Sequence, residues 1–351
     1  PLVHKVYILL DRTDLYTPIQ KSRNQNEVVM SDLTNLETIK RARAGLPKAI
    51  RTTPIIPLAR DAAEIGNETL FLKCENMQVT GAYKIRAAFT AMLALSDEAR
   101  AKGVVMASSG NFAQAFAYAG REMGAPVAVV MLDSTSPYKV AQTEGHGAEV
   151  IFCGDDAMVR QPTVLRVAKE QGMTAIDTWE FPPITAGHAS IGMEILEQCP
   201  DVEQVLVPVS SGGMAAGTAT AIKLQNPGVK VIGVQPEKAN AAYVSMEKGE
   251  LVTIDYWDSI ADGLSARCPG SFPFRHLQAY MDEIVLISEQ DIVDAFRTIL
   301  LRAKQIGEPA GVVAPAGFLS GKIDTGLKTV AVLTGGNISA EMAEKMLAMS
   351  A

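Results

Sequence analysis

The sequence lacks the features that define several broad classes of protein. No stretch reaches 18 consecutive apolar residues, and the longest candidates are as short as 125–132, so we expect no membrane span. The apolar patch at 6–10 is too short for a secretory signal. Acidic residues outnumber basic residues by 39 to 32, and this net charge of −7 argues against a partner such as nucleic acid or an anionic membrane.

Cysteine is also scarce. The chain has only four cysteines among its 351 residues, and they are widely scattered. No two of them form a C-x-x-C pair, and none stands at a spacing typical of metal ligands. The sequence therefore predicts neither a disulfide framework nor a cysteine-bound metal, and we expect a reduced, cytoplasmic protein.

What is present is the pattern of a large α/β protein. Apolar residues make up 48% and charged residues 20%, which is typical of globular chains, and the length suits one large domain or two smaller ones. Residues 1–29 show little periodicity and are interpreted as an N-terminal extension. A helix is predicted to start near Asp32 and to run to about Ala44.

From Thr69 onward, short apolar runs alternate with amphipathic stretches, which predicts a doubly wound α/β architecture. Strands are expected at 70–74, 104–107, 127–132, 149–152, 174–177, 205–209, 230–234, 283–287 and 329–333. Helices are expected at 112–122, 137–144, 157–171, 189–197, 214–224, 289–303 and 340–348. Sheets of this kind bind ligands at the carboxyl ends of their strands.

A run rich in small residues, 208–217, follows one buried strand and opens a helix, and it contains Ser210-Ser211-Gly212-Gly213-Met214. Small side chains let the backbone turn tightly, and the N–H groups at a helix start carry partial positive charge. The run is therefore a candidate phosphate-binding loop. A plain tight turn between strand and helix explains such a run about equally well.

Lys84 is a candidate reactive lysine. The strand at 70–74 ends near Glu75, a turn passes through Gly81, and Lys84 begins the next helix. The positive end of a helix disfavours an ammonium, which suits a lysine that forms a Schiff base. On composition alone, a solvated surface lysine is the more common explanation.

Two further strands end in polar turns. The turn Ser108-Ser109-Gly110-Asn111-Phe112 offers hydroxyls and N–H groups that suit a carboxylate, although the same residues also serve simply to cap a helix. Thr334 follows the strand at 329–333 and offers one hydroxyl, although threonine is also a common strand former.

Taken in order, these motifs resemble those of the fold-type II family of pyridoxal-phosphate enzymes, in its branch of threonine/serine dehydratases and serine racemases. The resemblance runs from about Thr53 to Asn337, and the string around Lys84 is its most specific part. It implies a tryptophan synthase β-like fold with two doubly wound open-sheet domains. These are a large cofactor-binding domain (30–102 plus 181–351) and a small mobile domain (103–180), and the resemblance also implies a homodimer.

The resemblance gives cofactor-binding roles to several candidates. Lys84 would join the aldehyde of pyridoxal 5'-phosphate as a Schiff base and later move the Cα proton. The run 210–214 would bind the cofactor phosphate, and Asn111 would hydrogen-bond the ring hydroxyl. Thr334 would meet the pyridine nitrogen, and Glu308 would line the cofactor pocket.

The resemblance also gives substrate-binding roles. The turn 108–112 would hold the substrate carboxylate, Ser109 would be the acid or base on the opposite face of the cofactor, and Arg160 would close over the substrate. Two positions depart from the branch: Phe112 replaces a histidine and His188 replaces a glutamine. We therefore form the hypothesis that an aromatic substrate such as phenylserine is tolerated; the alternative is that Phe112 only packs in its helix.

A divalent metal is not expected. The racemases of this branch hold one with two carboxylates and a backbone carbonyl, and the matching positions here are Gln235, Ala239 and Ala241. Hard cations need oxygen ligands, preferably charged ones, and both carboxylates are missing. Activity should therefore not depend on a metal.

The resemblance, added to the motifs, predicts a pyridoxal-phosphate-dependent ammonia-lyase. It would convert a 3-hydroxy amino acid of the threonine or serine type to a 2-oxo acid and ammonia by α,β-elimination of water. One alternative keeps the cofactor but changes the reaction, to an amino-acid racemase, such as a serine racemase, or a β-replacement enzyme. Another is a nucleotide or phosphate sensor without chemistry.

Overall fold

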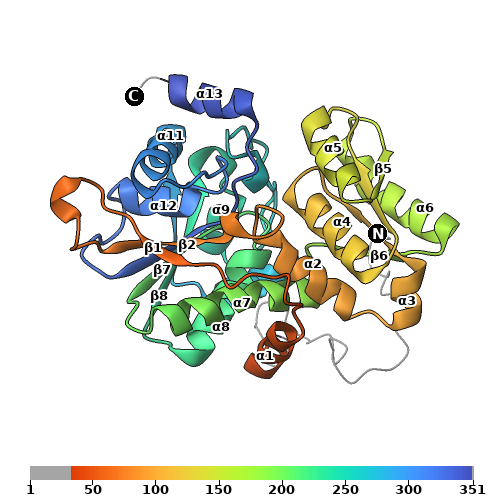
Figure 1. Ribbon diagram of the computed structural model, residues 1–351, viewed down its shortest axis with the longest axis horizontal. Helices are drawn as coiled ribbons and strands as arrows, with labels where there is room; N and C mark the ends of the chain where they lie inside the picture. The colour runs from red at the N-terminus through yellow and green to blue at the C-terminus, as the bar shows by residue number, and fades with distance from the viewer. Residues whose placement is uncertain (1–32, 350–351) are drawn as a thin grey trace.

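The computed structural model describes residues 33–349, in which two sheets are flanked by helices (Figure 1). The larger sheet has the strand order β1-β2-β10-β7-β8-β9, and the smaller has the order β5-β4-β3-β6. Every neighbouring pair is parallel except β1 and β2. The strands are β1 (Ile55–Pro57), β2 (Leu70–Cys74), β3 (Val104–Ala107), β4 (Val127–Met131), β5 (Glu149–Phe152), β6 (Thr174–Ala175), β7 (Gln204–Pro208), β8 (Lys230–Pro236), β9 (Glu283–Ile287) and β10 (Thr329–Leu333).

Helices cover both faces of the larger sheet. In Figure 1, α7 and α8 lie on one side of it, and α11 and α12 lie on the other. The helices are α1 (Leu36–Ala44), α2 (Lys84–Leu93), α3 (Asp97–Lys102), α4 (Asn111–Met123), α5 (Pro137–Gly145), α6 (Arg160–Gln171), α7 (Pro182–Gln198), α8 (Gly213–Gln225), α9 (Ala241–Lys248), α10 (Ser271–Tyr280), α11 (Glu289–Thr298), α12 (Val313–Leu319) and α13 (Ala340–Ala348).

Strand β7 shows why the apolar runs have no polar alternation. Val205 and Val207 pack in the core on the side of α7 and α8, whereas Leu206 packs in the core on the side of α12. Successive side chains of a strand point to opposite faces, so a strand covered on both faces is apolar throughout. The predicted α/β class and parallel pairing are confirmed.

Three predicted helices differ from the structure by four or more residues at one end. Helix α1 begins at Leu36 rather than near Asp32, which lies outside the described residues, because the Asn35 side chain accepts a hydrogen bond from the backbone N–H of Thr38. Helix α7 begins at Pro182, seven residues before its predicted start. The helix predicted to end at 303 gives way to a π-helical segment, Ile299–Ala303.

The smaller sheet lies within residues 104–175 and is seen beside the larger sheet in Figure 1. The division at 103 and 180 and the mobility of the smaller part stay predictions. The proposed extension, 1–29, lies outside the described residues. None of the helices between residues 33 and 349 is long and apolar enough to cross a membrane.

Candidate active site

Three loops meet where strands of the larger sheet end. The N–H of Tyr83, before α2, donates to the Thr334 carbonyl at 3.0 Å, and Ala82 forms an isolated bridge with Gly335. The N–H of Glu308, before α12, donates to the Gly335 carbonyl at 2.9 Å. These backbone bonds join the loops after β2 and β10 to the loop before α12, at the edge where open α/β sheets bind ligands.

Lys84 points its amine into an aromatic environment at this edge. Its Nζ lies 4.8 Å from the centroid of the Tyr83 ring and 4.7 Å from that of the Phe112 ring. These distances allow cation–π attraction. Within residues 33–349, no hydrogen-bond acceptor is paired with this amine. The two aromatic rings accept no hydrogen bond from the amine in the part of the chain that the structure describes, so its nitrogen is open to a ligand.

His188, on α7, borders the same space. Its ring centroid lies 4.9 Å from that of Tyr83 and 6.0 Å from that of Phe112. Burial holds the pKa of His188 well below its usual value, and the positive charges of Lys84 and Arg86 add to this effect. The imidazole is therefore neutral, and its Nδ1 is buried without a hydrogen-bond partner.

A chain of side chains fixes Asn111 at the start of α4. Asn111 Nδ2 donates to Glu308 Oε1 at 2.5 Å, and Asn337 Nδ2 donates to Asn111 Oδ1 at 2.8 Å. A Cβ atom on Gly335 would collide with the Glu308 carboxylate, so only glycine allows this close approach. Removal from water raises the pKa of Glu308 to about 7, although the bond from Asn111 opposes this shift.

The run 210–214 forms the turn between β7 and α8. Gly212 is the N-cap of α8 and has a φ of +99°, which side chains rarely allow. A Cβ atom on Gly213 would meet nothing nearer than 3.9 Å, where it would face the His188 ring. The run therefore places the N–H groups of a helix start, which lack partners within the helix, beside the His188 ring, and such N–H groups can bind an anion. Ser210 and Ser211 tie the turn in place, through bonds with Ala266 N and Gly270 N respectively.

Ser109 lies between two further polar residues. Its Oγ is 3.0 Å from Thr135 Oγ1 and accepts a bond from Arg160 Nη2 at 3.1 Å. Arg160 Nε is buried without a partner. A Cβ atom on Gly110 would meet nothing within 4 Å, so this turn also borders open space. Ser108 Oγ accepts a bond from the Gly110 N–H at 3.3 Å.

The structure thus brings together most of the predicted residues, and it adds three that the sequence did not single out. Lys84, Phe112 and His188 form one group, and Asn111 and Glu308 form another. The three additions are Tyr83, Thr135 and Asn337. Tyr83 adjoins Lys84 and Asn337 ends the stretch over which the resemblance runs, so their positions could have indicated them, whereas nothing in the sequence indicated Thr135.

Two predicted positions offer less than expected. The side chain of Met214 is buried and its Sδ accepts a bond from Thr218, so only its backbone faces a ligand. Thr334 is also buried, and its backbone makes the contacts described above.

The position matched to a metal ligand is occupied by an amide. Gln235 is fully buried, and its Oε1 accepts a bond from Tyr243 N at 2.9 Å. Between residues 33 and 349, no group of three or more His, Cys, Asp or Glu side chains is placed to hold a metal ion. Independence of metal stays a prediction.

Chemically, these groups suit a phosphorylated aldehyde. An amine without an acceptor can condense with the aldehyde, the start of α8 can bind the phosphate, and Asn111 can hydrogen-bond a ring substituent. The open space at Gly110 leaves room for such a molecule. The side chains present therefore fit pyridoxal phosphate.

Comparison with known proteins indicates the same cofactor. A family described as pyridoxal-phosphate dependent enzyme matches residues 46–335. An L-threonine ammonia-lyase of Geobacter sulfurreducens is 38% identical over 301 residues, which cover 86% of this chain and 75% of that protein. A catabolic L-threonine dehydratase of Staphylococcus aureus is 37% identical over 310 residues, with coverage of 87% and 90%. The solved structure of maize serine racemase has a TM-score of 0.84 at 29% identity, with coverage of 89% and 96%.

Proposed function

The chain belongs to the family of pyridoxal-phosphate-dependent enzymes and is a lyase of the ammonia-lyase type, and from this premise we propose that it acts on 3-hydroxy amino acids such as threonine and serine. The resemblance predicted from its ordered motifs is confirmed. The reaction removes the Cα proton and the β-hydroxyl as water. Hydrolysis of the released enamine takes up one water, so the net products are a 2-oxo acid and ammonia.

The observation that carries the proposal is the placement of Lys84. Its amine stands at the meeting point of three loops, within 5 Å of two aromatic ring centroids. When bound, pyridoxal phosphate supplies an electron sink that stabilises negative charge at the substrate Cα. We assign to Lys84 Nζ the attachment of the cofactor and the transfer of the Cα proton, and a positioned base of this kind contributes about 10²–10⁴ in rate.

The remaining cofactor contacts follow from the geometry. The backbone N–H groups at Gly212 and Gly213 would hold the phosphate at the start of α8. Asn111 would face the ring hydroxyl, because Glu308 and Asn337 hold its amide from both sides. With a pKa of about 7, Glu308 is partly protonated at neutral pH and can keep or share a proton near the ring.

Substrate contacts are assigned to the turn 108–112 and its neighbours. Its N–H groups and hydroxyls would bind the substrate carboxylate, with Arg160 supplying positive charge from α6. Neutral His188 would help to keep water out of the space next to Lys84, because it is buried and packs close to the Tyr83 and Phe112 rings.

Acceptance of an aromatic substrate is the finer part of the proposal. Phe112 is only 7% exposed, and its ring lies 5.3 Å from that of Phe116. Most of its surface is therefore used in core packing, which favours threonine and serine over phenylserine. Better turnover of phenylserine than of threonine and serine would instead support the aromatic hypothesis, and equal or weaker turnover would remove it.

The racemase alternative rests on Ser109. Its hydroxyl is held by Arg160 and Thr135, and maize serine racemase is a structural relative. A second proton-transfer group on the other face of the substrate is what racemisation needs. Formation of the D-enantiomer at a rate comparable with that of the oxo acid would favour this alternative.

The test is a substrate panel on the wild-type protein and on Lys84→Ala. Threonine, serine and phenylserine are assayed for 2-oxo acid, for the D-enantiomer and, with an added thiol, for thioether. The proposal expects oxo acid as the main product from threonine or serine, lost in Lys84→Ala. No oxo acid from any of the three would contradict it.

Two further properties belong to this proposal. We place the enzyme in the cytoplasm, because Cys74, Cys153, Cys199 and Cys268 are all free, as a reducing compartment would leave them. We also propose a homodimer, as the family resemblance implies. Sedimentation velocity of the full chain tests the second point, and a monomer at assay concentration would contradict it.

A further inference from the structure

A cluster of four charged side chains lies behind the site without taking part in the proposed chemistry. It consists of Lys73 on β2, Glu75 directly after β2, Arg86 on α2 and Glu194 on α7, and we call it the buried ion cluster. Each of the four is at most 4% exposed. Burying ions is costly unless they are paired and hydrogen-bonded, so such a cluster needs an explanation.

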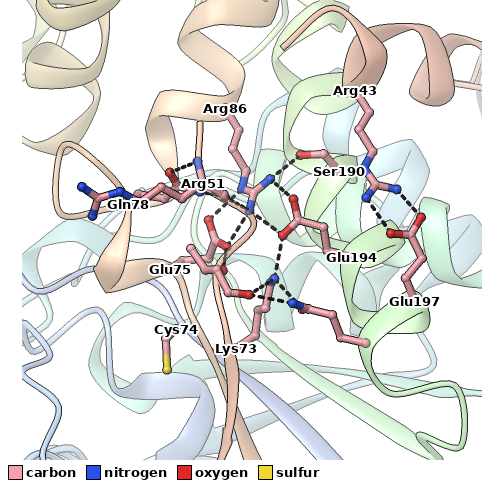
Figure 2. Close-up of polar contacts among 12 residues, drawn as sticks. Arg43, Arg51, Lys73, Cys74, Glu75, Gln78, Arg86, Ser190, Glu194 and Glu197 are labelled. Carbon is pink, nitrogen blue, oxygen red and sulfur yellow. Dashed lines mark hydrogen bonds and ion pairs between the residues drawn. The ribbon is translucent and has the colours of Figure 1, made fainter. Parts of the chain in front are cut away.

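Arg86 is the centre of this cluster (Figure 2). It forms one two-pronged pair with Glu75, from Nε at 2.8 Å and Nη2 at 2.9 Å. It forms a second with Glu194, from Nη1 at 2.6 Å and Nη2 at 2.8 Å. Ser190 Oγ and the Arg51 carbonyl accept further bonds. Every nitrogen of the planar guanidinium is therefore held, which fixes its position and its orientation.

Lys73 is the second cation of the cluster, opposite the two carboxylates of Glu75 and Glu194. Its Nζ donates to Glu194 at 2.6 Å, to the Thr53 carbonyl at 2.7 Å and to Gln198 at 2.8 Å. Although burial opposes charge, the two carboxylates hold the pKa of Arg86 above its usual value. Likewise, although burial opposes it, Arg86 and Lys73 hold the pKa of Glu75 below its usual value. Burial lowers the pKa of Lys73, although the charges of Glu75 and Glu194 oppose this shift. Arg86 and Glu75 thus favour their charged forms.

The position of Arg86 relates the cluster to the site. Lys84 and Arg86 are two residues apart in the first turn of α2, so their side chains leave the helix about 200° apart. Lys84 faces the rings of Tyr83 and Phe112, whereas Arg86 reaches back to β2 and α7. Tyr83, the N-cap of α2, gives no side-chain cap, and the backbone bonds of Ala82 and Tyr83 hold the residues before the helix rather than its first turn.

We propose that Arg86 is a positioning residue: its two-pronged pairs with Glu75 and Glu194 fix the first turn of α2 and thereby aim the Lys84 amine at the site. This inference rests on the role proposed for Lys84. A cluster that only stabilised the fold would change unfolding without changing the reactivity of that amine. The two roles therefore predict different measurements.

The experiment compares Arg86→Lys with the wild type and with Arg43→Lys. Lysine keeps the charge but cannot form two two-pronged pairs. Arg43 is the matched control, because it makes a two-pronged pair with Glu197 on the outer side of α7 (Figure 2). Each purified protein is incubated with excess pyridoxal phosphate and treated with borohydride at timed intervals. Peptide mass spectrometry then measures the fraction labelled at Lys84, at a temperature where every variant is folded.

We expect Arg86→Lys to slow labelling of Lys84 by about tenfold or more and to lower kcat more than it raises KM, because misplacing a reacting group by about 1 Å costs up to about 10² in rate. Arg43→Lys should label at the wild-type rate. If wild type is labelled and Arg86→Lys is labelled equally fast, this inference alone fails. If the wild type is not labelled at Lys84, the proposed role of Lys84 fails with it.

A milder variant covers the case in which Arg86→Lys does not fold. Ser190→Ala removes one bond from Arg86 Nη1 and leaves both ion pairs in place. We expect it to slow labelling of Lys84 by about twofold to threefold, in line with the loss of one hydrogen bond. Labelling at the wild-type rate in Ser190→Ala would then overturn the inference.

Discussion

The two sides of α2 differ in how their polar groups are satisfied. Behind the helix, Arg86 and Lys73 have protein partners for every nitrogen, and the charges cancel. In front of it, Lys84 Nζ has no acceptor among residues 33–349, and His188 Nδ1 is buried without a partner. A side built for the fold satisfies its own groups, whereas a side built for a ligand leaves some of them to the ligand.

The largest expected effect comes from removing the amine on the ligand side. Lys84→Ala should lower oxo-acid formation by about 10³-fold or more, because the proposed base is lost. Stability should change by no more than about 1 kcal/mol, because the amine contacts only two rings. Steady-state assays and urea unfolding measure the two quantities.

Lys102→Ala is the control for this variant, because it removes an exposed lysine that pairs only with Glu98 on α3. It should leave both activity and stability near wild type. A Lys84→Ala protein that kept most of its activity would remove the distinction between the two sides of α2.

The next largest effect should come from the buried ion cluster on the opposite side of α2, and it should be a loss of stability. Glu75→Ala leaves the buried ion cluster with one uncompensated positive charge, because Arg86 and Lys73 then share only Glu194. Breaking a buried pair in this way costs about 3–5 kcal/mol. The free energy of unfolding in urea measures this cost. Glu197→Ala, which breaks an exposed pair with Arg43, should cost about 0–1 kcal/mol.

Equal losses in Glu75→Ala and Glu197→Ala would show that burial of the cluster has no special cost. Stability would then give no reason to distinguish the cluster side of α2 from the Lys84 side.

The sequence could predict those features that neighbouring residues determine. Strands β2, β9 and β10 were predicted with their observed bounds, because apolar runs between turns are a local signal. Strand β1, Ile55–Pro57, was missed because its three residues are too short a run to stand out. The turns at 108–112 and 210–214 were found because glycine and serine mark them locally.

Long-range pairing was beyond the sequence. Lys73 lies in an apolar strand, and nothing near it indicates a carboxylate 121 positions away at Glu194. Thr135 was missed for the same reason, since it meets Ser109 across 26 positions. Lys84 was a candidate from its place at a helix start, but a surface lysine was the more common explanation until the order of the motifs favoured a cofactor site.

A smaller effect on the pH dependence of stability should come from Glu308, because burial favours its protonated form. The pKa of its carboxyl rises from 4.5 to about 7 on folding. Between pH 4.5 and pH 7, Glu308 therefore binds a proton more fully in the folded state than in the unfolded state. This stabilisation is present below about pH 4.5 and is lost as pH rises toward 7. Removing it in Glu308→Gln should flatten the pH dependence of unfolding by about 1–3 kcal/mol.

Urea unfolding from pH 5 to pH 8 tests this point. Glu37→Gln, which changes a carboxylate that is 83% exposed, should keep the wild-type pH dependence. If Glu308→Gln also keeps it, then Glu308 is ionised throughout and its place on the ligand side needs another explanation.

The smallest expected effect is that of removing divalent cations. Gln235 occupies the position matched to a metal ligand, and its amide is buried. Its Oε1 accepts a bond from the Tyr243 backbone N–H, whereas its Nε2 has no hydrogen-bond partner among residues 33–349. An amide without a nearby carboxylate is a poor ligand for Mg²⁺ or Ca²⁺. Treatment with a chelator, and then addition of either cation, should change kcat and KM by less than about twofold. Strong inhibition that either cation reverses would mean that oxygen ligands elsewhere in the chain hold a metal, because Gln235 carries no charge with which to attract one.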